Sequence, residues 1–146
     1  MTSAQKRTLR PTPPGGAPDV TVPEGTRMDL VCGPRVAATA RDMARRWGED
    51  RTLSEAAVTR LTALVHAAVG HGLRFGPRAV TITVRWIDPD RMRVAVRWNA
   101  SWALALSSLD DGVLDQTVAI LDAFSQEWGF CAGRHGPVHW MVLEAC

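Results

Sequence analysis

The sequence contains little of what defines several common protein classes. No apolar run approaches the roughly 18–20 residues that a membrane-spanning helix needs, and the N-terminus lacks the apolar core of a secretory signal. The three cysteines, Cys32, Cys131 and Cys146, are an odd number at wide spacing, so no disulfide framework is expected. These absences predict a cytoplasmic protein that does not span a membrane.

The motifs of several large enzyme classes are also missing. The chain has no Gly-x-Ser-x-Gly nucleophile elbow, no Walker phosphate loop and no His-Glu-x-x-His zinc motif. A net charge of +2 does not require a nucleic acid or an anionic membrane as partner. The length of 146 residues, with 46% hydrophobic and 22% charged residues, is typical of one globular domain.

Two parts of the chain differ in composition. Residues 1–26 are rich in proline, glycine, threonine and basic residues and show no apolar periodicity, so they are expected to form a disordered arm. Residues 27–146 are expected to form a single α/β domain.

The segment Leu53–Gly72 has the strongest helical pattern in the chain. Thr52 and Glu55 predict a capping box at its start, and Gly70 and Gly72 predict its end. Its apolar residues follow the helical period and predict one buried stripe: Leu53, Ala57, Leu61, Leu64, Val65, Ala68 and Val69.

Two more helices and five strands are expected around this one. One helix opens at Pro34 and ends at Gly48, and another runs from Leu114 through Trp128 and ends at Gly129. The order β-α-α-β-β-α-β-β predicts a two-layer sandwich, with helices on one face of a mixed, mostly antiparallel sheet. The expected strands are Met28–Cys32, Ala79–Ile87, Met92–Asn99, Phe130–Ala132 and Pro137–Glu144.

Three segments together resemble a known family. The long helix ends as Ala-Val-Gly-His-Gly, a later segment reads LDQTVAILDAFSQEWGF, and the last strand reads GPVHWMVL. This outline, over about Met28 to Leu143, resembles the histidine-kinase-like ATPase superfamily, in particular the small bacterial serine kinases that act as anti-sigma factors. The resemblance implies the same α/β sandwich.

The residues that carry the chemistry in that family are absent from the long helix. In the family, this helix bears a glutamate that acts as general base and an asparagine that holds Mg²⁺. Aligned on His71, those positions are Ala63 and Ala67. The resemblance therefore implies a degenerate nucleotide site, without cofactor or metal.

The other nucleotide-binding positions have changed as well. The family's adenine-binding aspartate corresponds to Trp98, or to Asn99 one residue later. Two phosphate-binding glycines correspond to Asp115 and Thr117, and an aspartate repels phosphate. Trp98 either fills the space that adenine occupies in the family or is an ordinary core residue.

The resemblance, together with the missing residues, implies a pseudokinase: a non-catalytic regulatory protein that binds a sigma factor or its antagonist, or forms a homodimer. Two alternatives remain: a divergent ATP-binding serine/threonine kinase, and a small-molecule sensor that re-uses the vacated pocket. The family's lid over ATP corresponds here to an apolar segment with Trp102, Leu104 and Leu106. Such a segment either folds over the empty pocket or binds a partner.

A second candidate surface is the polar face of the expected sheet. Arg85, Arg93 and Arg97 alternate with apolar residues and share this face. It is an alternative partner-binding face. Nucleic acid is not expected, because alternation sends the neighbouring tryptophans to the opposite side, away from the arginines.

One spacing is reminiscent of a zinc site. Cys131, His135 and His139 are each four residues apart, with Cys146 as a fourth candidate. The stretch is predicted to be strand, glycine turn and strand, which does not align these side chains. A buried cysteine with solvated turn histidines is therefore the favoured interpretation. His66 is expected to face solvent and His71 to cap the helix end.

Overall fold

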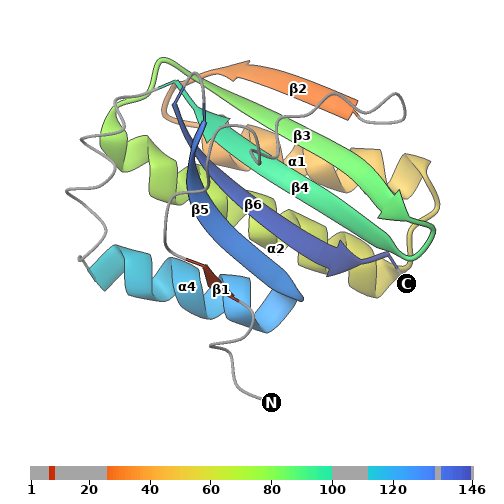
Figure 1. The fold of residues 1–146 in the computed structure, drawn as a ribbon. Coiled ribbons are helices and arrows are strands. Elements are labelled where there is room, and N and C mark those ends of the chain that lie inside the picture. Colours follow the sequence, from red (N-terminus) through yellow and green to blue (C-terminus); the bar gives the residue numbers. More distant parts are fainter. Residues whose placement is uncertain (1–6, 9–25, 100–111, 134–135, 146) are drawn as a thin grey trace.

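The computed structural model describes residues 7–8, 26–99, 112–133 and 136–145, which form a sheet with helices on one face (Figure 1). The strand order is β1-β5-β6-β4-β3-β2, and every pairing is antiparallel except that of β1 with β5. The strands are β1 (Arg7–Thr8), β2 (Thr26–Val31), β3 (Ala79–Asp88), β4 (Arg91–Trp98), β5 (Glu127–Gly133) and β6 (Gly136–Glu144). The helices are α1 (Val36–Asp50), α2 (Glu55–Gly72) and α4 (Gly112–Phe124), with the short 3-10 helix η3 (Leu73–Phe75).

This arrangement confirms the predicted two-layer α/β sandwich and its element order from β2 onward. The pairing of β1 with Trp128 and Gly129 was not predicted, because the proline-rich composition around it shows no strand periodicity. None of the helices in the described ranges is both long and apolar enough to cross a membrane.

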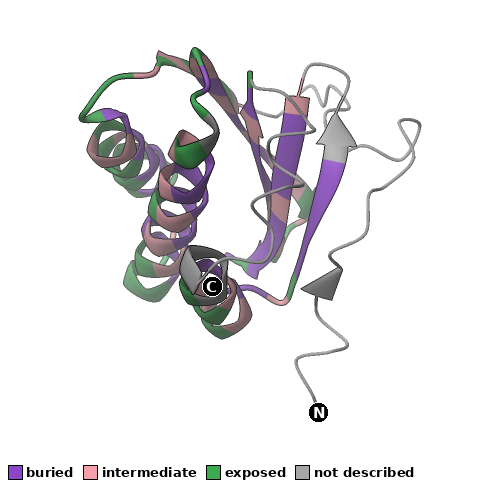
Figure 2. Cartoon of the chain, turned by 90° about the vertical axis from the view of Figure 1, so that its left-hand side faces the viewer, coloured by how far each residue is buried: buried purple, intermediate pink, exposed green. Residues whose placement is uncertain are grey.

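The main core lies between the helices and one face of the sheet, which we call the inner face (Figure 2). Alternation along β3 and β4 sends every second side chain to this face, and the antiparallel register brings Ile82 opposite Val96 and Val84 opposite Val94. The central helix α2 contacts α1, α4, β4 and β6. All seven residues of its predicted stripe are buried or packed against the core.

The start of α2 differs from the prediction. Its N-cap is Ser54, whose hydroxyl accepts a hydrogen bond from the backbone N–H of Ala57 at 3.1 Å. Thr52 lies before the helix in a left-handed conformation with φ of 54°. The predicted capping box at Thr52 is therefore wrong, and the N-cap lies two residues later, because Ser54 is also a favoured N-cap residue and the chain path decides between the two.

The helix α2 ends at Gly72, as predicted, but Gly72 is not a left-handed stop; the left-handed glycine is Gly76, with φ of 65°, after η3. The predicted end of α1 at Gly48 is two residues early, because α1 continues to Asp50. An added Cβ at Gly48 would come 3.1 Å from Val58 of α2, so this glycine permits close packing of the two helices.

The third helix is shorter than predicted. It ends at Phe124, where the Ser125 hydroxyl donates to the carbonyl of Leu121. Trp128 and Gly129 belong to β5. Trp128 stands four residues after Phe124 and two before Phe130, so its spacing fits helix and strand equally well. In the structure Trp128 belongs to a strand, in which its side chain is buried on the inner face of the sheet.

Candidate functional site

Two alanines on α2 occupy the positions that the sequence resemblance matched to a general base and a Mg²⁺ ligand. Ala63 and Ala67 are both half-buried and stand one turn apart. Neither side chain has a nitrogen or oxygen atom, so neither can hold Mg²⁺ or accept a proton. One turn further along lies His71, in the last turn of the helix.

Trp98 ends β4 and is fully buried against the end of α2. Its indole lies over the backbone of Gly72, so closely that an added Cβ there would come 1.8 Å from Trp98 Cε2. Gly72 itself has ordinary helical angles, with φ of −69° and ψ of −20°. Glycine is therefore needed at this position for space and not for backbone conformation.

Trp98 is the centre of a cluster of four buried rings, which come from α2, β4, β5 and β6. Its ring centroid lies 5.9 Å from His71, 5.0 Å from His139 and 5.7 Å from Phe130. His139 packs edge-on against Phe130 at 4.6 Å and is stacked parallel to His71 at 5.4 Å. We call Trp98, His71, His139 and Phe130 the ring cluster. It fills the space between α2 and this end of the sheet.

The environment of His139 keeps its imidazole neutral. Its side chain has 0% exposure, and neither ring nitrogen has a hydrogen-bond partner in the described parts of the chain. Burial, together with the neighbouring charge of His71 when protonated, lowers the pKa of His139 well below its usual value. This environment favours a neutral His139 imidazole that packs against its neighbours as an apolar ring.

His71 lies in the last turn of α2, at the helix end where the sequence placed it, but its side chain is buried at 2% exposure. The prediction for His139 was wrong, because it is fully buried and is not a solvated turn residue. Strand alternation contained the signal, since His139 shares its face with Met141 and Leu143. His66 is exposed, as predicted.

The residues with zinc-like spacing, Cys131 and His139, are not brought together into a metal site. Cys131 pairs with Val138, and Phe130 pairs with His139, so Cys131 and His139 face opposite sides of the sheet. His135 and Cys146 lie outside the described residues. Within the described ranges, no three residues of the His, Cys, Asp and Glu types are grouped to hold a metal ion.

The sequence resemblance matched three further residues, Asn99, Asp115 and Thr117, to nucleotide-binding positions. Asn99 is exposed, and its backbone N–H donates to the carbonyl of Ala79 at 3.0 Å. Thr117 is buried on α4 at 5% exposure. Asp115 lies on α4, but its side chain is outside the described set. The predicted partner residues Trp102, Leu104 and Leu106 also lie outside the described residues.

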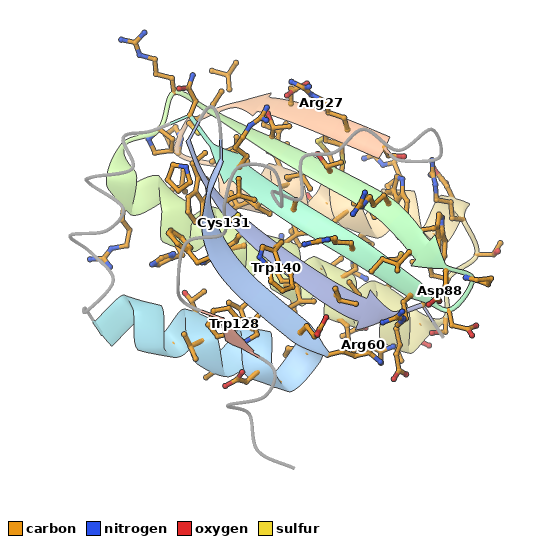
Figure 3. All side chains as sticks on the ribbon, in the orientation of Figure 1. Arg27, Arg60, Asp88, Trp128, Cys131 and Trp140 are labelled. Carbon is orange, nitrogen blue, oxygen red and sulfur yellow. The ribbon has the colours of Figure 1, made fainter. Side chains whose placement is uncertain are left out.

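The predicted arginine face exists on the side of the sheet away from the helices, which we call the outer face. Arg85 and Arg93 stand directly opposite each other on β3 and β4. The Arg93 guanidinium lies 4.9 Å from the ring of Trp140 on β6. Trp140, which is labelled in Figure 3, was not singled out from the sequence. Burial and the adjacent charge of Arg85 lower the pKa of Arg93.

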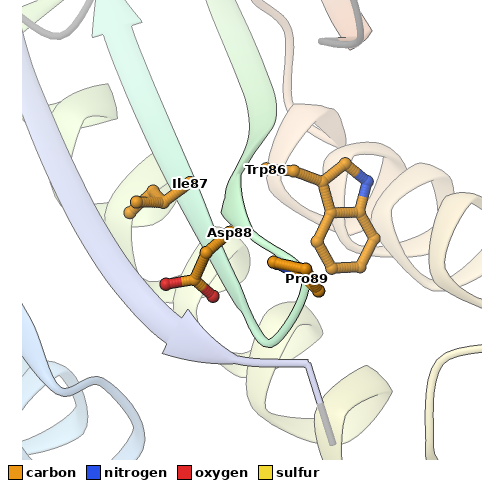
Figure 4. Close-up of a pocket in the computed structure, with 4 residues that line it drawn as sticks. All are labelled: Trp86, Ile87, Asp88 and Pro89. Carbon is orange, nitrogen blue, oxygen red and sulfur yellow. The ribbon is translucent and has the colours of Figure 1, made fainter.

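A hollow of about 420 Å³ lies at the β3–β4 turn and is lined by Trp86, Ile87, Asp88 and Pro89 (Figure 4). A bulge between Trp86 and Asp88 shifts the register and leaves Ile87 42% exposed. The Asp88 carboxylate accepts from Arg91 Nε at 2.8 Å and from the Asp90 N–H at 2.9 Å, and these bonds lower the pKa of Asp88. The carboxylate holds the turn, and this hollow therefore offers mainly apolar surface.

The fold is the two-layer α/β sandwich described above, with the ring cluster packed between α2 and the end of β4. Among solved structures, it is similar to the RsbU and RsbW domains of Rv1364c from Mycobacterium tuberculosis. The TM-score is 0.60 at 14% identity, and the match covers 82% of this chain and 32% of that chain. No protein-family model matches the sequence, and no curated protein matches it either.

Proposed function

We propose that this protein is a non-catalytic regulatory protein with the fold of an anti-sigma factor kinase, which acts by binding a protein partner. The observation that carries the proposal is the fully buried Trp98, whose indole lies directly against Gly72. The sequence resemblance matches Trp98 to the family's adenine-binding aspartate. An indole in this place competes directly with a nucleotide base for space.

The residues at the other nucleotide positions support the same proposal. The general base and the Mg²⁺ ligand are replaced by Ala63 and Ala67. Removing both a base and a metal ligand removes the two groups on which phosphoryl transfer depends in this family. The similar solved structure contains an RsbW domain, which supports a regulatory role and a partner such as a sigma factor or its antagonist.

The nucleotide part of this proposal is tested by thermal unfolding. Millimolar ATP or ADP with Mg²⁺ should leave the melting temperature unchanged, measured against an inorganic phosphate control of equal ionic strength. A ligand at a hundredfold excess over its Kd would stabilise the protein by about 2.7 kcal/mol. A Mg²⁺-dependent rise would contradict the proposal and favour a divergent kinase.

The partner part is tested by affinity capture with the full-length chain as bait. We expect a sigma factor or its antagonist in the captured set, and weaker capture by Trp102→Ala, with a loss of about 2 kcal/mol in binding as for an anchor residue. Arg85→Ala/Arg97→Ala is the matched bait for the alternative face. Normal partner binding by both baits would remove both candidate surfaces, and a retained metabolite without a protein partner would favour a sensor.

A further inference from the structure

Strand β2 forms one edge of the sheet (Figure 1). It pairs with β3 over Thr26–Val31 without a register shift, and no strand in the described ranges pairs with its other side. The strand contains neither a proline nor a bulge, two of the devices that keep edge strands from pairing. The backbone of β2 is therefore a regular template for another extended strand.

Alternation along β2 decides which backbone groups face this edge. The Cys32 N–H, directly after the strand, donates to the carbonyl of Arg78 at 3.0 Å, so the even-numbered residues direct their N–H and C=O groups toward β3. The groups of Arg27, Asp29 and Val31 therefore point to the edge that no described strand covers. A strand added here must bond to these three residues.

The side chains of the same three residues are exposed and carry opposite charges. Arg27, which is labelled in Figure 3, forms an ion pair with Asp29 at 3.0 Å, and the two side chains are 62% and 57% exposed. Hydrogen bonds from Thr81, at 2.6 Å, and from Arg27 lower the pKa of Asp29, so its carboxylate is charged at neutral pH. Val31 is 86% exposed. The edge thus carries a positive charge, a negative charge and an apolar side chain at successive outward positions.

This arrangement is complementary to a second copy of itself. In an antiparallel pair with a two-fold axis at Met28, Arg27 of each copy stands directly opposite Asp29 of the other, and each such pair exchanges both of its N–H···O bonds. Moving the axis to Arg27 or to Asp29 places like charges opposite each other, which destabilises the pair. The charges therefore select one register among those that the backbone allows.

The inner side of the edge adds apolar contact in the same register. Met28, at 8% exposure, would meet Met28 of the second copy, and the half-buried Leu30 would meet Thr26. The Trp47 indole donates to Thr26 at 2.8 Å, so α1 borders this edge, and the half-buried Met43 lies one turn before Trp47. Pairing would therefore bury apolar side chains as well as backbone groups.

We propose that two copies of this chain associate through β2, with the two strands antiparallel and Met28 on the two-fold axis. The two sheets then form one continuous sheet, with the helices of both copies on the same side. The outer faces of the two copies become one surface, so a protein partner would meet the arginine face twice.

The charge pairing is tested by sedimentation equilibrium of the full-length chain, which should be a dimer. Asp29→Arg and Arg27→Asp should each raise the dissociation constant of the dimer about tenfold, because like charges then face each other twice. A mixture of the two variants should recover the original value, since the arginines of one chain then face the aspartates of the other. Glu127→Arg, at an exposed position of β5, is the control and should change nothing.

Three results of this experiment would overturn the proposal. They are a monomeric original chain, variants that remain as dimeric as the original chain, and weakened variants whose mixture shows no recovery. Melting temperatures of the separate variants show whether each one is folded.

The position of the two-fold axis is tested by disulfide formation after Cys32, Cys131 and Cys146 are replaced by serine. Met28→Cys brings two Cα atoms to about 4.5 Å across the axis, within the range of a disulfide. The matched control Leu30→Cys separates them by about 14 Å. Mild oxidation should join Met28→Cys chains into a covalent dimer and leave Leu30→Cys chains single. Equal crosslinking of the two variants, or none in Met28→Cys, would contradict this register.

Discussion

Two tryptophans on neighbouring strands lie against glycines on opposite faces of the same sheet. Trp98 lies on Gly72 at the inner face, and Trp140 lies on Gly129 at the outer face. Trp98 is fully buried and enclosed by His71, His139 and Phe130, whereas Trp140 is half-buried beside Arg93. The same contact therefore fills a space on one face and makes a platform on the other.

The difference lies in what surrounds each ring. A helix closes the inner face over Trp98, so every atom of the indole is packed and its loss leaves a cavity. On the outer face, no described helix covers Trp140. The inner ring should therefore determine stability, and the outer ring should determine what the surface binds. The following substitutions test this distinction, in order of expected effect.

Removing the inner ring should have the largest effect. Trp98→Ala is expected to lower the free energy of unfolding by about 3–5 kcal/mol, because it deletes a fully buried indole from a closed core. Urea unfolding followed by circular dichroism measures this. A loss below about 1 kcal/mol, the level of an ordinary surface change, would show that Trp98 is not a core residue.

Adding a methyl group beneath each ring compares the two contacts directly. Gly72→Ala should cost about 1–3 kcal/mol or more, because Trp98 has no room to move, although alanine is otherwise favoured in a helix. Gly129→Ala should cost less, since Trp140 is only half-buried whereas Trp98 is fully buried. In the double variant Gly72→Ala/Trp98→Ala, the two losses should not add, with a coupling of about 0.5–3 kcal/mol. Strict additivity would contradict the contact.

Acid should weaken the inner cluster. Because the folded-state pKa of His139 is lowered, the unfolded chain binds the proton first, and stability that is present above pH 6.5 is lost as the pH falls below that value. A single such histidine costs about 1.4 kcal/mol between pH 7.5 and 5.5. His139→Phe should flatten this part of the stability curve, and His66→Gln is the matched exposed control. An unchanged slope in His139→Phe would assign the pH dependence to other groups.

The outer ring should contribute the least to stability. Trp140→Ala is expected to cost only about 0.5–1 kcal/mol, the order of an exposed cation–π contact with Arg93. Chemical denaturation of this variant beside Trp98→Ala provides the comparison. Equal losses for the two variants would mean that the outer face is as closed as the inner one.

Periodicity determined much of this protein before any tertiary information. The apolar stripe of α2 and the alternation of β3 and β4 predicted which residues form the core, because each helix or strand can bury only one face. The same alternation also placed Trp98 on the buried side of its strand, where it is the last residue of β4. The α/β sandwich and its element order followed from those patterns.

The tertiary structure decided the roles of the glycines and histidines. Gly48, Gly72 and Gly129 read as helix ends in the sequence, but each lies where a neighbouring side chain approaches the backbone. His71 and His139 are far apart in the chain, and only the pairing of β6 with β4 and the packing of α2 bring them into contact. Local patterns report the conformation of a segment, whereas space beside a glycine and burial of a ring depend on residues that meet only in the fold.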